Sequence, residues 1–155
     1  MKTLEKIKAV LENTTLMVEA ANSCDKAYAV GTGNPDWYAP FGIEKPEAIA
    51  INVAGVQAVV SGIGILAVLR GAGNVDDSVI EILDDIINDN LSKTEMSIML
   101  RLANCAWGAG QAFRSDKGPL GRMSNMNVFD LLPEEEVAKD YHQIKAAALF
   151  LRKNI

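Results

Sequence analysis

Apolar residues recur every three or four positions through much of the chain, which is the spacing of one face of an α-helix. The first such face runs from Leu4 to Tyr28 and ends at the glycines Gly31 and Gly33. We therefore expect one long helix here, with Asn13–Thr15 as the place where it can break. The face consists of Leu4, Ile7, Leu11, Thr14, Val18, Ala21, Cys24 and Tyr28.

The longest uncharged segment lies between Glu47 and Arg70, where 22 consecutive residues carry no charge. That length is sufficient to cross the roughly 30 Å hydrocarbon core of a bilayer. Its polar side chains, its glycines and its lack of flanking aromatic or basic clusters favour a buried central helix instead. A ridge of small side chains recurs at every fourth position, at Ala50, Ala54, Ala58 and Gly62. Such a ridge allows close approach of another helix, from the same chain or from a second subunit.

Three further helices are predicted downstream from their start signals. Asn74 is an N-cap, Ser92 and Glu95 form a capping box, and Pro133 opens the last helix ahead of three glutamates. Their buried stripes are predicted at Val79, Ile82, Leu83, Ile86 and Ile87, at Met96, Met99, Leu100, Ala103, Ala106, Trp107 and Gly110, and at Val137, Tyr141, Ile144, Ala148 and Leu151. Because no strand-like alternation occurs, the sequence predicts an all-α single domain over residues 1–155, a bundle of about five main helices. Two ordered loops, from Gly31 to Pro46 and from Arg114 to Asn127, complete it.

Composition sets limits on function and location. With 155 residues, 49% of them hydrophobic and 23% charged, the chain can bury one core and is not of a disordered class. Its net charge of -5 argues against nucleic acid as a partner. Cys24 and Cys105 lie far apart and no secretory signal precedes them, so we expect buried thiols in a reducing, cytoplasmic environment.

Two clusters in the predicted loops are candidates for binding a ligand. Trp37 and Tyr38 could stack on a planar ring. Arg114, Lys117 and Arg122 make the second loop cationic, and its glycines expose backbone N–H groups that suit an anion. These five side chains are the predicted ligand-binding residues, although anchoring of the first loop on the bundle and ordinary flexibility of the second are the simpler interpretations.

A run of acids on one predicted helix raises a metal-dependent alternative. Glu81 and Asp84 fit one of the two carboxylate motifs of helical nucleotide pyrophosphohydrolases, which hold a divalent metal. The other motif occurs only at Glu44–Glu47, where Pro46 interrupts it. A solvated acidic face is therefore favoured, and His142 is expected on the surface. We predict no catalytic residue, no metal and no cofactor.

Two short stretches resemble the small ryanodine-receptor-repeat proteins of phages and bacteria. Asp25–Tyr28 together with Pro35–Trp37 is similar to their first helix and the turn after it, and Leu132–Tyr141 is similar to the start of their last helix. The matched residues number fewer than twenty of 155, and the stretch from Ala48 to Leu69 has no counterpart in that family. The resemblance implies a non-catalytic binding module for a nucleotide-like ligand, but it assigns no ligand residue.

We expect a non-enzymatic binding or interaction protein that forms a homo-oligomer. The small-residue ridge and two almost wholly apolar helices exceed what one small bundle readily hides. The expected partners are a second copy of the chain and either another protein or a small anionic ligand, and neither nucleic acid nor a membrane is expected. Two alternatives stay open: a binder of a small anionic nucleotide-like ligand, and a metal-dependent enzyme using Glu81, Asp84 and Asp85.

Overall fold

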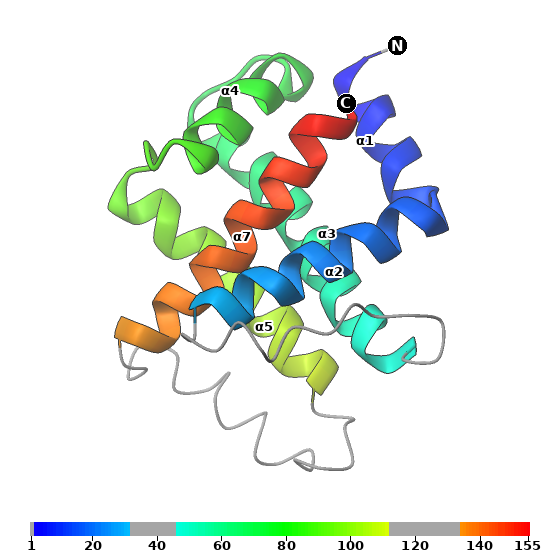
Figure 1. The fold of residues 1–155 in the computed structure, drawn as a ribbon. Coiled ribbons are helices and arrows are strands. Elements are labelled where there is room, and N and C mark those ends of the chain that lie inside the picture. Colours follow the sequence, from blue (N-terminus) through cyan, green and yellow to red (C-terminus); the bar gives the residue numbers. More distant parts are fainter. Residues whose placement is uncertain (1, 32–45, 112–133) are drawn as a thin grey trace.

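The computed structural model describes residues 2–31, 46–111 and 134–155, and these ranges form a bundle of six α-helices with no strand among them (Figure 1). The all-α prediction is confirmed. The helices are α1 (Thr3–Glu12), α2 (Thr14–Gly31), α3 (Pro46–Leu69), α4 (Val75–Ile87), α5 (Lys93–Gln111) and α7 (Glu134–Asn154). Both predicted loops fall largely outside the described residues.

The first predicted helix is divided in two at Asn13. This residue has an extended backbone, with φ -88° and ψ 107°, and its N–H group donates to the carbonyl of Val10. Its side-chain oxygen accepts a hydrogen bond of 3.0 Å from the N–H group of Leu16. Asparagine side chains compete with helical hydrogen bonds in this way, so one residue ends α1 and caps α2.

Helix α3 occupies the centre of the bundle, as the sequence predicts. It packs against α2, α4, α5 and α7, and in Figure 1 its cyan ribbon lies behind α2 and α7. Val56, Val59, Ile63 and Leu66 are almost completely buried. One stretch among the described residues, Ile49–Leu69, is long and apolar enough to cross a membrane, and 44% of it is buried inside the bundle.

Two glycines on α3 allow it to approach α5 closely. A Cβ atom added at Gly55 would collide with the indole ring of Trp107, and one added at Gly62 would collide with the sulfur of Met99. The predicted ridge of small residues, from Ala50 to Gly62, therefore does not stay on one face of α3. Gly62 is buried against α5, whereas Ala50 is exposed and the residues between them on the ridge are half-buried.

The predicted starts of α4 and α5 are confirmed. The side chain of Asn74 accepts a hydrogen bond of 3.0 Å from the N–H group of Asp76, which is an N-cap contact. Ser92 and Glu95 form a reciprocal capping box, because each side chain accepts from the N–H group of the other residue, at 3.1 and 3.0 Å.

Only one of the two predicted buried thiols is buried. The Cys24 thiol is buried between α2 and α7, where it lies 3.8 Å from the carbonyl of Gln143. Burial, aided by the charge of Asp25, raises the pKa of Cys24 to about 12, so this thiol stays protonated. Cys105 is exposed, because it lies on the outward face of α5 one turn after the exposed Arg101.

The turn after α4 is fastened to α7 by a polar cluster. Asp89 adopts a left-handed backbone, with φ 59°, and its carboxylate accepts a hydrogen bond from the hydroxyl of Tyr141. The Lys145 ammonium lies 3.1 Å from both carboxylate oxygens. These two donors lower the pKa of Asp89, while burial and the neighbouring carboxylate raise the pKa of Tyr141.

Replacing Tyr141 by phenylalanine should lower the free energy of unfolding by about 1 kcal/mol, the usual net value of one hydrogen bond. The ring would stay packed while the carboxylate of Asp89 and the carbonyl of Ile86, 3.2 Å from the hydroxyl, would lose a donor. Urea unfolding measures this difference. His142→Ala, at an exposed position beside Tyr141, is the control and should change stability by less than about 0.5 kcal/mol. Equal losses in both variants would contradict a role for the hydroxyl.

Candidate interaction surface

Helix α3 leaves one uncharged strip of its surface outside the bundle. We call this strip the α3 seam, and it consists of Ala50, Ala54, Gln57, Ser61, Gly64 and Val68. Four of these residues are exposed, and Ala54 and Gly64 are half-buried. Their spacings alternate between four and three residues, which is the repeat of two helices that pack along each other at a shallow angle.

Large apolar side chains are exposed at the end of α3, where the seam reaches Val68. Val68 is 65% exposed and Leu69 is 63% exposed, and Ile65 on the flank of the seam is 41% exposed. Single exposed apolar residues are ordinary on soluble proteins, but three within five positions form a contiguous patch. Such a patch makes the end of α3 a candidate surface for contact with another molecule.

Small residues leave room along the seam. A Cβ atom added at Gly64 would meet no other atom within 4 Å, in contrast to Gly55 and Gly62 on the inner side of the same helix. The three glycines thus separate two faces of α3. The inner face makes a close crossing with α5, and the seam is open to solvent.

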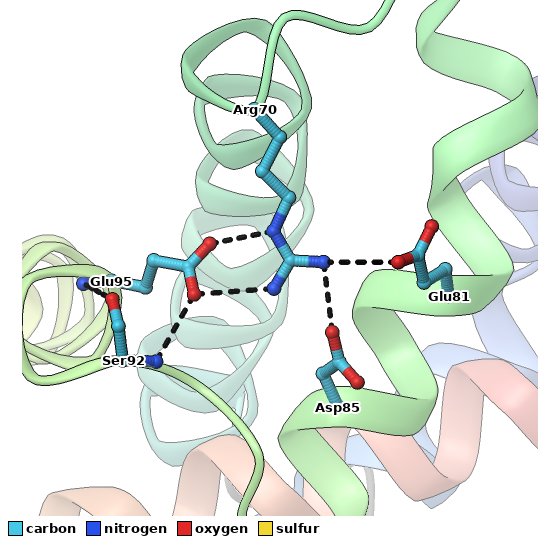
Figure 2. A network of polar contacts seen from close by, with 5 residues as sticks. All are labelled: Arg70, Glu81, Asp85, Ser92 and Glu95. Atoms are coloured by element: carbon cyan, nitrogen blue, oxygen red, sulfur yellow. Dashed lines mark hydrogen bonds and ion pairs between the residues drawn. The ribbon is translucent and has the colours of Figure 1, made fainter.

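Arg70 lies two residues after Val68, the last residue of the seam, and Figure 2 shows its guanidinium between Glu95 on one side and Glu81 and Asp85 on the other. Its guanidinium contacts Glu95 on α5 twice, at 2.6 and 3.2 Å, and Asp85 on α4 at 2.8 Å. Glu81, also on α4, lies 3.8 Å away. Since two residues turn a helix by about 200°, Arg70 and Val68 point to opposite sides of α3. The network leaves the apolar end of the seam free of charge.

These contacts keep both members of the main ion pair charged. The hydrogen bond from Arg70, supported by those from Ser92, lowers the pKa of Glu95 despite its partial burial. The same carboxylate and that of Asp85 raise the pKa of Arg70. A guanidinium with three acidic neighbours is engaged within the bundle, so it is a structural link between α3, α4 and α5.

The acids proposed for a metal site do not converge on one point. Glu81 and Asp85 face Arg70, whereas Asp84 lies 3.0 Å from the guanidinium of Arg152 on α7. Within residues 2–31, 46–111 and 134–155, no group of three histidine, cysteine or acidic side chains is placed to hold a metal ion. Sequence reasoning missed both arginine partners, because they lie on other helices.

The predicted ligand-binding residues Trp37, Tyr38, Arg114, Lys117 and Arg122 lie outside the described residues. Binding of a planar or anionic ligand by these side chains therefore stays a prediction. His142 is exposed on α7, as expected from the sequence.

Comparisons with known proteins add no family assignment. No protein-family model matches the chain, and neither a curated protein nor a solved structure matches it. The resemblance to ryanodine-receptor-repeat proteins stays an expectation drawn from two short stretches.

Proposed function

We propose that this protein is a helical interaction protein that works as a homo-oligomer, with the α3 seam of one copy packed against the α3 seam of another. The observation that carries the proposal is the uncharged seam together with the exposed apolar residues at the end of α3, which are Ile65, Val68 and Leu69. The role that follows is recognition of a protein surface rather than turnover of a substrate.

A second copy of the chain fits the chemistry of this surface. A strip of small, uncharged residues suits a partner surface that is also uncharged and that can approach closely. The seam of a second copy has both properties. Two seams related by a two-fold axis present the same patch to each other, which is the usual contact of soluble dimers. Each copy carries a net charge of -5, but the seam has no charged residue, so repulsion is weakest along it.

A bilayer is the other apolar environment that could cover this face. A membrane span must be apolar on every side that contacts lipid. The remaining sides of α3 are covered by α2, α4, α5 and α7, and those helices carry exposed charges such as Glu81, whose side chain is 71% exposed. Burial of the whole bundle in lipid would place these charged side chains in hydrocarbon. Pairing of two copies through the seam leaves them in water.

Replacing Val68 by glutamate should weaken self-association at least tenfold, because pairing would bring two new carboxylates together in an apolar contact. Sedimentation velocity over a range of protein concentrations measures the association constant. Ser61→Glu tests the middle of the seam in the same way. Both positions are exposed in the single chain, so circular dichroism should show unchanged helix content.

Leu149→Glu is the matched control for this experiment. Leu149 is also a large apolar residue, 51% exposed, but it lies on α7 outside the seam. The control should self-associate like the wild type. A wild-type protein that is monomeric at every concentration would refute the proposal, as would equal weakening by Val68→Glu and Leu149→Glu.

A further inference from the structure

A second feature, separate from the seam, is a cavity that is open to solvent, between the beginning of α5 and the beginning of α7. Its volume is about 410 Å³, which falls in the range of pockets that hold small organic ligands. It is lined by Leu91, Lys93, Met96, Ser97, Leu100 and Val137. The lining comes from the turn before α5, from one face of α5 and from α7.

The lining combines apolar walls with two polar groups on one side. Lys93, Ser97 and Leu100 follow each other at spacings of four and three, so they share one face of α5. Leu91, Leu100 and Val137 are aliphatic, and Met96 adds a flexible thioether that adapts to an irregular ligand. The cavity is therefore amphipathic, with its cation and its hydroxyl both on α5.

Of the described residues, Lys93 is the one cation that lines this cavity. Arg70, Lys145 and Arg152 each lie within 4.0 Å of a carboxylate, whereas Lys93 is exposed and pairs with no acid in the described part of the chain. An unpaired ammonium beside an apolar cavity, in a chain with net charge -5, is a candidate counter-charge for a ligand. The positive end of the α5 dipole at this position favours an anion further.

We infer that this cavity binds a small amphipathic carboxylate. The apolar body of the ligand contacts Leu91, Leu100 and Val137, and its carboxylate pairs with the ammonium of Lys93 and accepts a hydrogen bond from the hydroxyl of Ser97. This site is lined by other residues than the two predicted loop clusters, and it does not depend on self-association through the seam.

Isothermal titration calorimetry with decanoate, kept below its critical micelle concentration, tests the inference on the full chain. Saturable binding of one decanoate per chain is expected. Lys93→Met keeps the apolar stem of the side chain but removes its charge, and it should weaken binding roughly fivefold, the value of one partly exposed ion pair. Decan-1-ol, which lacks the charge, should bind the wild type more weakly by a similar factor. Ser97→Trp fills the cavity and should abolish binding.

Lys8→Met is the matched control, because Lys8 is an exposed lysine on α1, away from the cavity. It should bind decanoate like the wild type. Absence of saturable binding to the wild type would overturn the inference. Equal weakening by Lys93→Met and Lys8→Met would overturn it too, as would unchanged binding by a folded Ser97→Trp variant.

Discussion

Replacing Gly55 by alanine should lower the free energy of unfolding by about 2 to 3 kcal/mol, although alanine is the better helix former. The added methyl group would collide with the indole ring of Trp107, a side chain that is only 5% exposed. A rigid ring packed on several neighbours cannot move aside, so α3 and α5 would have to separate. Interiors packed at crystalline density tolerate such a shift poorly.

Two other glycines of α3 provide graded controls. At Gly62 the added methyl group would meet the end of Met99, a flexible side chain that can change rotamer, so we expect a loss of about 1 kcal/mol. At Gly64 it would meet nothing within 4 Å, so alanine should stabilise the protein by up to about 1 kcal/mol through helix propensity alone. Urea unfolding at a protein concentration low enough for every variant to be monomeric measures the series, because Gly64 belongs to the proposed interface between copies.

The close crossing of α3 and α5 is tested by the order of the free energies of unfolding of the three alanine variants. A stabilising Gly55→Ala, similar to Gly64→Ala, would mean that α3 and α5 do not cross closely at Trp107. A loss at Gly55 no greater than that at Gly62 would show that the indole ring moves as easily as the Met99 thioether.

Local signals in the sequence predicted most helix boundaries correctly. Asn74 and the box of Ser92 and Glu95 are predictable because a cap involves residues within three positions of each other. Asn13 is predictable as a break for the same reason, since its side chain bonds the N–H group of Leu16. The number of helices rose from about five to six in the described residues because this break is complete.

The orientation of small residues around α3 was harder to predict. A row at every fourth position drifts by about 40° per step around an α-helix, because the helix has 3.6 residues per turn. The predicted ridge therefore winds from Ala50 on the outside to Gly62 against α5. A row that alternates spacings of four and three drifts by only about 20° per seven residues, so the seam stays on one face. Such a row can be started at any residue of this uncharged helix, so only the packing of the bundle shows which row stays open.

The partners of the acidic residues could not be predicted from sequence. The sequence favours a solvated face for the acids of α4, but only Asp77 and Glu81 on that helix are exposed, whereas Asp76, Asp84 and Asp85 are half-buried. Their arginines come from elsewhere: Asp85 pairs with Arg70 at the end of α3, and Asp84 pairs with Arg152, 68 positions away. Such pairs depend on how helices cross, which no local spacing encodes.

The link made by Arg70 should contribute measurably to stability. Replacing Arg70 by methionine keeps the apolar stem but leaves the carboxylates of Glu81, Asp85 and Glu95 without their shared cation. We expect a loss of about 1.5 kcal/mol at neutral pH, a value already reduced for solvent screening at a partly exposed site. Chemical unfolding at low ionic strength measures it, and added salt should narrow the difference.

The pH dependence of this loss distinguishes the ion pair from simple packing. The pKa of Glu95 is lower in the folded protein than its ordinary value of 4.5. Its contribution is therefore fully present above that ordinary value and is lost as the pH falls through the lowered pKa of the folded state. The difference in stability between wild type and Arg70→Met should stay constant from pH 7 to about pH 5.5 and then shrink as the solution is acidified further.

Arg152→Met is the matched control for Arg70→Met. Arg152 pairs with one acid, Asp84, and the two side chains are 42% and 47% exposed, against 24% and 18% for Arg70 and Glu95. A single exposed pair contributes only a few tenths of a kcal/mol. If the two variants lose equal stability, or if the loss in Arg70→Met persists at acid pH, then the ion pairs of Arg70 with Glu95 and Asp85 do not account for the loss, and the charge of Arg70 does not link α3, α4 and α5.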